Sequence, residues 1–359
     1  MSLDSARKKI DAIDKRIVDL LNDRARASQE IGRVKDASGQ GIYAPHREKE
    51  ILERLKKLAG KGPLTTEAIE AIYREIMSFS ISLEKKVTIA YLGPAVTYTH
   101  QAAQKKFGSS VEYAPCGSIS DVFSDVENGR CDYGVVPVEN STEGAVNHTL
   151  DLFIESDLKI YAEIYLPIHH HLLSLGGTLS GVTQVYSKDQ VFGQCRLWLE
   201  SHLRGVGLVD TASTAEAARI VAENAKREGV ACIASRIAAD VYGLKIVASS
   251  IEDNKDNTTR FIVIARQEAK PTKADKTSIV FEIKDRAGAL HDILLPFKRA
   301  KINLTKIESR PSKKKKWSYF FFLDLEGHHE DRKVKAALSE LARHCAFFKI
   351  LGSYPRAGE

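Results

Sequence analysis

Cysteine is scarce in this chain, and its cysteines do not occur in pairs. The 359 residues include five cysteines, and no two of them form a Cys-x-x-Cys arrangement. This pattern argues against a zinc site and against a disulfide framework. We therefore interpret Cys116, Cys131, Cys195, Cys232 and Cys345 as reduced core residues.

Long apolar runs are also absent. Apolar residues make up 43% of the chain and charged residues 28%, and no uninterrupted apolar run reaches the roughly 20 residues that span a bilayer. The N-terminal stretch Met1–Asp4 lacks the basic and apolar regions of a signal peptide. We expect a cytoplasmic protein without a membrane partner.

Signals for dinucleotides, metals and nucleic acids are missing as well. The stretch Gly205–Gly207 is too short for a dinucleotide fingerprint. In the run His169–His171, only the first and last residues would share a strand face, and no carboxylate is near in sequence. The net charge is +6, and the basic run Lys313–Lys316 is best explained as a solvated hairpin loop. We expect no metal, no cofactor and no nucleic-acid partner, and a structural or cleft-lining role for the three histidines.

What the sequence does contain is three segments with different periodicities. Residues 1–85 carry helical periodicity, which predicts an all-α domain of three helices. Residues 86–267 alternate short apolar runs with helical stretches, which predicts a two-lobed α/β domain. The polar stretch Gln267–Lys276 is typical of a linker. Residues 275–359 have the β-α-β-β-α-β order of a ferredoxin-like α+β domain.

The helical segment places polar side chains where an apolar core would be expected. Its first helix has an apolar stripe that consists of Ile10, Ile13, Ile17, Leu20 and Leu21. Arg24 continues this stripe, and Lys35 follows 11 residues later, so both point to the same face. Further polar residues on the apolar faces are Arg47, Glu48, Ser80 and Glu84. Because buried charges are costly unless paired, this clustering predicts a pocket for an anionic ligand, with interhelical salt bridges as the alternative.

With Arg7 added, this set of residues resembles the all-helical class of chorismate mutases. The resemblance implies an intertwined homodimer in which Arg7 reaches the site of the other copy. It also implies that Arg24 and Arg7 of the partner subunit hold the two carboxylates of chorismate. Lys35 and Glu84 would then contact the ether oxygen of the substrate, and Glu48 its ring hydroxyl. Glu84 can donate a hydrogen bond there only when it is protonated.

The residue types suit such a reaction on physical grounds. A concerted rearrangement needs neither a nucleophile nor a proton transfer. Its rate therefore depends on holding a compact conformer of the substrate and on stabilising charge at the breaking C–O bond. Arginine and lysine side chains supply both effects.

The α/β segment carries five stretches rich in hydroxyl and amide residues. They are Gly93–Gln101, Val136–Gly144, Tyr186–Cys195, Ser213–Ala218 and Asn257–Phe261. Three of them follow a strand and precede a helix, where backbone N–H groups and small polar side chains can bind anions. Each stretch alone is more typical of a helix cap. In order and spacing, however, they resemble the prephenate dehydratase family, which implies two lobes like those of a type-2 periplasmic binding protein with the site between them.

This second resemblance assigns roles to individual residues. It implies that Thr259 is the general acid, which protonates the departing ring hydroxyl while carbon dioxide leaves. Aromatisation drives that step, so a well-placed hydroxyl donor can suffice. Arg260 would orient the site or pair with a substrate carboxylate. The residues implied to line the cleft are Glu139, Asn140, Ser141, Ser187 and Gln194.

Two stretches of the C-terminal segment resemble the phenylalanine-binding motifs of ACT regulatory domains. They consist of Gly288, Ala289, Leu290 and His291, and of Glu308, Ser309, Arg310 and Pro311. Because such a domain pairs side by side with its copy, the resemblance implies L-phenylalanine as effector and a homodimer or a tetramer. A purely structural dimerisation domain is the alternative.

The three resemblances together imply a chain that converts chorismate to prephenate and prephenate to phenylpyruvate, in phenylalanine biosynthesis with feedback by L-phenylalanine. A mutase fused to an arogenate dehydratase is the enzymatic alternative, because the two substrates differ at one side chain. A non-enzymatic amino-acid-sensing regulator is the alternative from another class. The polar cluster of the helical segment, together with a Thr-Arg strand edge, argues against that regulator.

Overall fold

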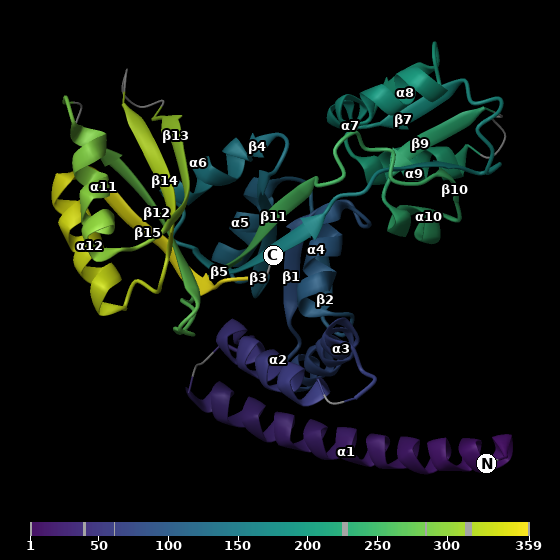
Figure 1. Ribbon diagram of the computed structural model, residues 1–359, viewed down its shortest axis with the longest axis horizontal. Helices are drawn as coiled ribbons and strands as arrows, with labels where there is room; N and C mark the ends of the chain where they lie inside the picture. Colours follow the sequence, from purple (N-terminus) through teal and green to yellow (C-terminus); the bar gives the residue numbers. More distant parts are fainter. Residues whose placement is uncertain are drawn as a thin grey trace. The chain divides into compact units, whose positions relative to one another are not determined.

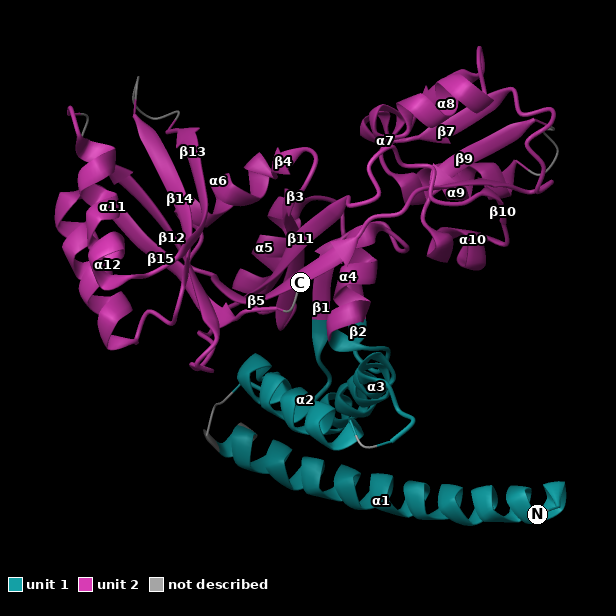
Figure 2. Cartoon of the chain, viewed as in Figure 1, with its two compact units in different colours: residues 1–88, 107–112 teal, residues 89–106, 113–359 magenta. Residues whose placement is uncertain are grey.

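The chain forms two compact units (Figure 2). The first, called here the helical unit, comprises residues 1–88 and 107–112, and the larger unit comprises residues 89–106 and 113–359. The computed structural model describes residues 2–38, 41–60, 62–224, 229–283, 286–312 and 318–357, so the predicted lysine loop Lys313–Lys316 lies outside them. Within these ranges, no helix has both the length and the apolar character needed to cross a membrane.

Three helices form the helical unit, as the periodicity predicted. They are α1 (Leu3–Ser38), α2 (Pro45–Ala59) and α3 (Thr66–Glu84) (Figure 1). Proline is tolerated in the first turn of α2, where backbone N–H groups have no partner within the helix. The Thr65 side chain caps α3 by accepting a hydrogen bond from Ala68 N (3.2 Å). Helix α1 approaches α3 closely at Gly32, where a Cβ atom would lie 3.0 Å from Cα of Glu84.

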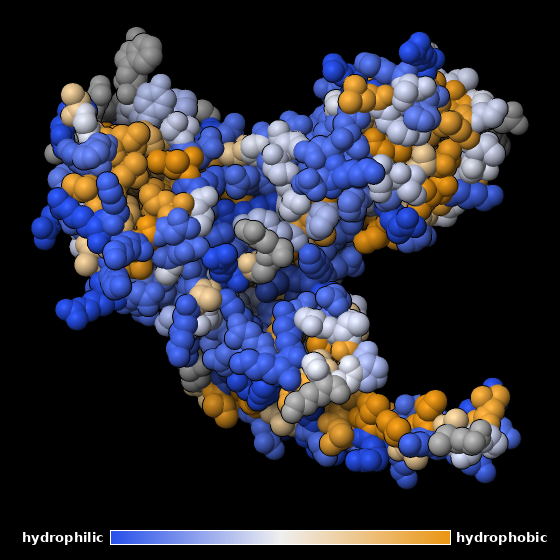
Figure 3. Space-filling view, viewed as in Figure 1, coloured by the Kyte–Doolittle hydropathy of each residue, from blue (hydrophilic) through white to orange (hydrophobic). Residues whose placement is uncertain are grey.

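The apolar stripe of α1 is exposed in the single chain. Ile13 is 45% exposed, Ile17 47% and Leu20 64%. Figure 3 shows apolar side chains gathered along this long helix. Contiguous apolar surface of this kind marks sites of association, because leaving it in water costs free energy.

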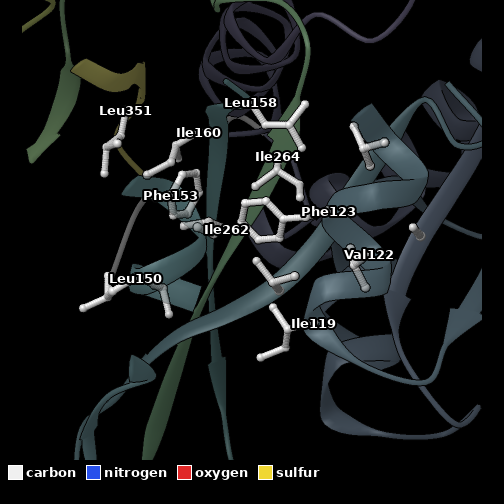
Figure 4. Packing of buried hydrophobic residues seen from close by; sticks show 14 of the residues in the cluster. Ile119, Val122, Phe123, Leu150, Phe153, Leu158, Ile160, Ile262, Ile264 and Leu351 are labelled. Carbon is white, nitrogen blue, oxygen red and sulfur yellow. The ribbon is translucent and has the colours of Figure 1, made fainter. Parts of the chain in front are cut away.

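The first lobe of the larger unit is a mixed sheet with the strand order β2-β1-β3-β11-β5. Its strands are β1 (Thr88–Leu92), β2 (Glu112–Cys116), β3 (Tyr133–Asn140), β5 (Lys159–Pro167) and β11 (Thr258–Ala265), and β4 (Gly144–Ala145) pairs with β3. Its helices are α4 (Tyr98–Phe107), α5 (Ile119–Glu127) and α6 (Asn147–Glu155). Phe123, Phe153 and Ile262 belong to the core of this lobe (Figure 4).

The second lobe is a sheet with the strand order β10-β6-β9-β7-β8. Its strands are β6 (His171–Ser174), β7 (Gln184–Ser187), β8 (Gly207–Asp210), β9 (Val230–Ala234) and β10 (Lys245–Ala248). Its helices are α7 (Asp189–Gln194), α8 (Arg196–His202), α9 (Thr214–Glu223) and α10 (Arg236–Tyr242). The chain then returns to the first lobe, where β11 enters between β3 and β5. The expected two-lobed α/β architecture is therefore confirmed.

The C-terminal domain has the predicted β-α-β-β-α-β order. Its sheet, in the order β13-β14-β12-β15, consists of β12 (Asp275–Ile283), β13 (Leu304–Pro311), β14 (Tyr319–Glu326) and β15 (Cys345–Pro355). One face packs on α11 (Ala289–Ala300) and α12 (Arg332–His344). The expectation that the linker extends to Lys276 was wrong, because β12 begins at Asp275 and Lys276 is buried.

The other face of the C-terminal sheet packs on the first lobe. Val280, Phe322 and Leu351 share one hydrophobic core with Phe153 and Ile262. At Gly352 the backbones of β15 and β5 touch, since a Cβ atom there would lie 2.2 Å from the carbonyl oxygen of Ile160. Glycine is therefore required for this close approach, and the C-terminal domain and the first lobe form one continuous packed body.

Candidate functional site

An ion pair joins the C-terminal ends of α1 and α3. Lys35 Nζ donates to Glu84 Oε2 (2.8 Å) and to the carbonyl oxygen of Ile42 (2.7 Å). The Glu84 side chain is only 8% exposed. The close approach of α1 at Gly32 places Glu84 within reach of Lys35, so this predicted pair is brought together.

Arg24 lies beside this pair, because its partner on α3 is one turn away from Glu84. Its guanidinium donates to the Ser80 hydroxyl and to the carbonyl oxygen of Ile76 (3.4 Å). Ser80 and Glu84 are four residues apart on α3 and so share one helix face. Burial lowers the pKa of Arg24. Two cations and one carboxylate thus stand on a single face of the helical unit.

The two predicted residues of α2 differ in their surroundings. Glu48 Oε2 accepts a hydrogen bond from the hydroxyl of the buried Tyr43 (2.6 Å). Arg47 is exposed and pairs with Glu50 (3.0 Å). Arg7 also lies on α1, 17 residues before Arg24, which is about 26 Å along the helix axis. One chain therefore does not bring Arg7 and Arg24 to one site.

In the larger unit, Thr259 and Asn140 are opposite each other on neighbouring strands β11 and β3. Asn140 Nδ2 donates to Thr259 Oγ1 (2.8 Å) and to Asn257 Oδ1 (2.7 Å). Asn140 Oδ1 accepts from the backbone N–H groups of Thr142 (3.0 Å) and Glu143 (3.1 Å). Because the amide is the donor to Thr259, the threonine hydroxyl accepts this bond and keeps its own proton available for donation.

A chain of hydrogen bonds extends from this pair into the second lobe. Gln194 Oε1 accepts from Asn257 Nδ2 (3.3 Å) and from His170 Nε2 (2.8 Å). His170 Nδ1 and the Tyr98 hydroxyl are 3.0 Å apart. Gln194 Nε2 also donates to Glu143 Oε1 (3.3 Å). Side chains from both lobes thus meet around Thr259.

The triple-histidine run has a carboxylate partner that its sequence neighbourhood did not reveal. Glu252 Oε1 lies 2.8 Å from His169 Nδ1, and Glu252 Oε2 accepts from the backbone N–H of His170 (2.9 Å). Among the described residues, no group of three or more His, Cys, Asp or Glu side chains is arranged to hold a metal ion. Burial lowers the pKa of His170, although its bond to Gln194 opposes the shift.

Arg260 points away from Thr259, because adjacent residues of a strand face opposite sides of the sheet. Its guanidinium is 7% exposed and contacts protein groups: Glu163 (3.0 Å), Asp324 (2.5 Å) and the Tyr354 hydroxyl (2.7 Å). Burial alone would lower the pKa of Arg260, but these groups outweigh it and hold the pKa well above its usual value.

Three further residues were expected to line the cleft, and each has a defined hydrogen bond or ion pair. Ser141 Oγ accepts from the backbone N–H of Thr258 (3.0 Å), which ties the loop after β3 to the start of β11. Glu139 pairs with Lys306 of β13 (2.9 Å). Ser187 is fully buried, and its hydroxyl donates to the Ile233 carbonyl (2.9 Å), so its hydroxyl is bonded to backbone outside the cluster around Thr259.

The loop before α4 contains Val96 in an unusual backbone conformation. Its φ is +72°, in a region that β-branched residues rarely adopt. A glycine at this position would adopt the same backbone without strain. The buried side chain of Val96 packs against Leu173 and other core residues of the second lobe.

The two candidate effector motifs lie at one end of α11 and along β13. Gly288 has φ +79° and precedes the first turn of α11, with Leu290 and His291 exposed. On β13, Ser309 and Pro311 are exposed, whereas Arg310 is buried and pairs with Asp151 of α6 (2.9 Å).

Tyr98 was not predicted individually as a member of the cluster around Thr259, whereas Asn257 was expected at the edge of the cleft and His170 in a structural or cleft-lining role. Tyr98 and Asn257 lie within stretches that had been recognised, and His170 is the middle residue of the histidine run. The sequence signal that points to them is their position within these polar stretches. Their mutual contacts depend on the return of β11 from the second lobe.

Comparison with known proteins agrees with this division of the chain. The family model for chorismate mutase type II matches residues 6–85, that for prephenate dehydratase matches residues 89–269, and that for the ACT domain matches residues 277–343. The bifunctional chorismate mutase/prephenate dehydratase of Aquifex aeolicus is 51% identical over 99% of this chain and 98% of its own length. That of Stutzerimonas stutzeri is 46% identical with the same coverage.

The larger unit is also similar to a solved dehydratase structure. Prephenate dehydratase from Arthrobacter aurescens, determined in complex with L-Phe, is 36% identical with a TM-score of 0.69. The match covers 76% of this chain and 90% of that protein.

Fold and comparisons together define a multidomain enzyme that joins an isomerase and a lyase to an ACT domain. The chain belongs to the family of bifunctional chorismate mutase/prephenate dehydratases. It is therefore an enzyme rather than a non-enzymatic regulator, and the matching dehydratases are named for prephenate rather than arogenate.

The lowered pKa of His170 predicts a pH-dependent stability. Between about pH 6.5 and the lower folded pKa, the unfolded chain binds this proton and the folded chain does not. The contribution is therefore fully present above about pH 6.5 and is lost as the pH falls. His170→Gln should make the decrease in unfolding free energy from pH 7 to pH 5 shallower, by up to about 1.4 kcal/mol per pH unit. Urea denaturation at pH 7 and pH 5 measures the unfolding free energy, and His344→Gln, at an exposed position, is the control. If the unfolding free energy of His170→Gln decreases as much as that of the wild type, the prediction is contradicted.

Proposed function

We propose that the helical unit rearranges chorismate at a site built around Arg24, Lys35 and Glu84. The proposal is supported by the Lys35–Glu84 pair (2.8 Å) and by the position of Arg24 one turn away on the same face. Two cations there can hold a substrate carboxylate and stabilise negative charge on the ether oxygen. Because Lys35 already contacts Glu84, both side chains can reach one ligand atom.

Residues of α2 would complete the recognition of chorismate. Glu48 is held by Tyr43 (2.6 Å) and would accept a hydrogen bond from the ring hydroxyl. Arg47 stands next to it and would add positive charge for the dianionic substrate. Ser80 would fix the guanidinium of Arg24 rather than contact the reacting bond.

We further propose that the mutase site forms in a homodimer. The proposal is supported by the exposed stripe of α1 and by the separation of Arg7 from Arg24 in one chain, which is about 26 Å along the helix. In a two-fold dimer the same surface is used by both copies. Arg7 of the partner subunit would then hold the second carboxylate of chorismate.

This arrangement predicts complementation between two inactive variants. Arg7→Ala and Arg24→Ala should each lose most mutase turnover. After unfolding and refolding together in equal amounts, they should recover about a quarter of wild-type activity, since half of the dimers carry one intact site. Chorismate consumption measures the recovery, and each variant refolded alone is the control. No recovery in a mixture that forms dimers would contradict the shared site.

In the larger unit, we propose Thr259 as the general acid for prephenate. The observation that supports this role is the bond from Asn140 Nδ2 to Thr259 Oγ1 (2.8 Å), which leaves the threonine proton available. Protonation of the ring hydroxyl lets it leave as water, and the electron pair from the broken C–C bond of the departing carbon dioxide completes the aromatic ring. Asn140, Ser141 and Gln194 would hold the strand and loop around the substrate.

Replacement of Thr259 should separate the two activities. Thr259→Ala is expected to lower formation of phenylpyruvate from prephenate by at least about 100-fold, the scale of general acid catalysis. Mutase turnover on chorismate should stay at the wild-type value, because the sites lie in different units. Thr258→Ala, the neighbouring threonine on the opposite strand face, is the matched control. The assignment fails if phenylpyruvate formation survives in Thr259→Ala, or if both activities fall together.

The C-terminal domain is proposed to bind L-phenylalanine through the motifs that begin at Gly288 and Glu308. Support comes from the ACT family match and from the L-Phe complex of the dehydratase from Arthrobacter aurescens. Feedback on the dehydratase would follow from a difference in effector affinity between an active and an inhibited state.

This role predicts loss of binding when a negative charge enters the first motif. Leu290→Asp should weaken binding of L-phenylalanine at least about tenfold, or 1.4 kcal/mol, because the new carboxylate repels that of the ligand. Calorimetric titration measures the change. Leu197→Asp, on the exposed surface of α8, should bind like wild type. Equal affinities of Leu290→Asp and wild type would place the effector elsewhere.

A cytoplasmic location is also proposed. All five cysteines are free thiols, and four of them are buried. Free thiols without a disulfide are typical of a reducing compartment.

A further inference from the structure

Thr259 and Arg260 attach one strand segment to two different parts of the molecule. Thr259 contacts Asn140 on the cleft side. On the other side, Arg260 contacts Glu163 of β5 (3.0 Å), Asp324 of β14 (2.5 Å) and the hydroxyl of Tyr354 on β15 (2.7 Å). A single buried guanidinium therefore joins the strand that carries the proposed acid to two strands of the C-terminal domain.

The buried charges around Arg260 include a second cation and two carboxylates. Lys276 of β12 also donates to Glu163 (2.8 Å), and Asp324 accepts a second bond from the Ser278 hydroxyl (2.5 Å). Arg260 and Lys276 thus balance Glu163 and Asp324, and none of these four side chains is more than 9% exposed. We call these four residues the Arg260 network.

A second connection starts from the strand of the proposed effector motif. Lys306 of β13 pairs with Glu139 (2.9 Å), the residue before Asn140, and Arg310 of the motif pairs with Asp151 of α6 (2.9 Å). Arg260 also lies 3.8 Å from Glu139. The effector strand therefore contacts Glu139, the residue before Asn140, and is linked to Arg260 through Glu139.

The geometry makes Thr259 sensitive to the placement of the C-terminal sheet. A guanidinium is planar and rigid, so its contacts to three groups on different strands allow few alternative arrangements. The register of β11 on β3 shifts between Arg260 and Phe261, and such bulges allow local bending of a strand. A small movement of β14 relative to β5 must therefore break a contact of Arg260 or displace the Thr259 backbone.

We propose that Arg260 is a positioning residue, and that its network transmits the state of the C-terminal domain to the Thr259–Asn140 pair. The inference rests on the proposed roles of Thr259 and of L-phenylalanine. Arg260 acts through the backbone of Thr259 and does not bind the substrate carboxylate.

The test uses the full-length Asp324→Asn variant, which removes one charge of the Arg260 network and keeps the side-chain shape. Its dehydratase kcat should fall by about tenfold or more, as expected from a displaced catalytic group. Its KM for prephenate should change by less than about twofold, because ground-state binding is untouched. L-phenylalanine should still bind in calorimetry but no longer inhibit.

Glu326→Gln is the matched control, because Glu326 lies two residues further along β14 and pairs with Arg356 (2.7 Å) at the surface. It should keep wild-type kcat and inhibition. If Asp324→Asn does not fold, as judged by the loss of a cooperative unfolding transition in urea followed by circular dichroism, Lys306→Met replaces it, with loss of inhibition at retained L-phenylalanine binding as the expected result.

Wild-type kcat together with wild-type inhibition in the folded variant would overturn the inference, as would an increase in KM at unchanged kcat. Failure of the proposed function has a different signature. In that case the wild-type chain itself would neither bind L-phenylalanine nor depend on Thr259 for phenylpyruvate formation.

Discussion

The buried guanidinium of Arg260 is the constraint on which the geometry of the larger unit depends. It lies where β11, the last strand of the α/β domain, enters between β3 and β5 and meets the C-terminal sheet. Breaking one partner of a buried ion pair typically costs about 3–5 kcal/mol, a large share of the roughly 5–15 kcal/mol that stabilises a domain. Burial alone would raise the pKa of Asp324, but Arg260 and Ser278 outweigh it and the pKa is lowered. The site on one side of β11 is thus held by charges on its other side.

The two proposed active sites differ in the charge of the groups that surround them. In the helical unit, cations stand next to a carboxylate, and the long apolar stripe of α1 is exposed in the single chain. A rearrangement that develops charge on an ether oxygen benefits from such cations. Around Thr259, by contrast, the contacts come mainly from amides, an imidazole and hydroxyls, with Glu143 as the carboxylate at the edge of the cluster. Neutral donors and acceptors can orient a weak acid without removing its proton.

Much of this structure could be predicted from the sequence, because local patterns determine it. Helical periodicity located α1 to α3, and the order of strands and helices identified the ferredoxin-like domain. The polar stretches after strands correctly brought Asn140, Gln194 and Thr259 together. What could not be predicted is pairing over long distances. Arg260 meets Asp324, 64 residues away in another domain, and His169 meets Glu252, 83 residues away. Lys276 was assigned to a linker because it is charged and lies in a polar stretch. Its burial depends on a partner distant in sequence, Glu163 of β5, which no local pattern reveals.

The most direct measurement is to incubate the purified wild-type chain with chorismate alone and to follow chorismate, prephenate and phenylpyruvate over time. If one chain carries both sites and its C-terminal domain controls the second, chorismate will disappear, prephenate will rise and then fall, and phenylpyruvate will accumulate. With added L-phenylalanine, prephenate will accumulate and will not be converted to phenylpyruvate. Consumption of chorismate without phenylpyruvate, or phenylpyruvate formation that L-phenylalanine does not slow, would contradict the account.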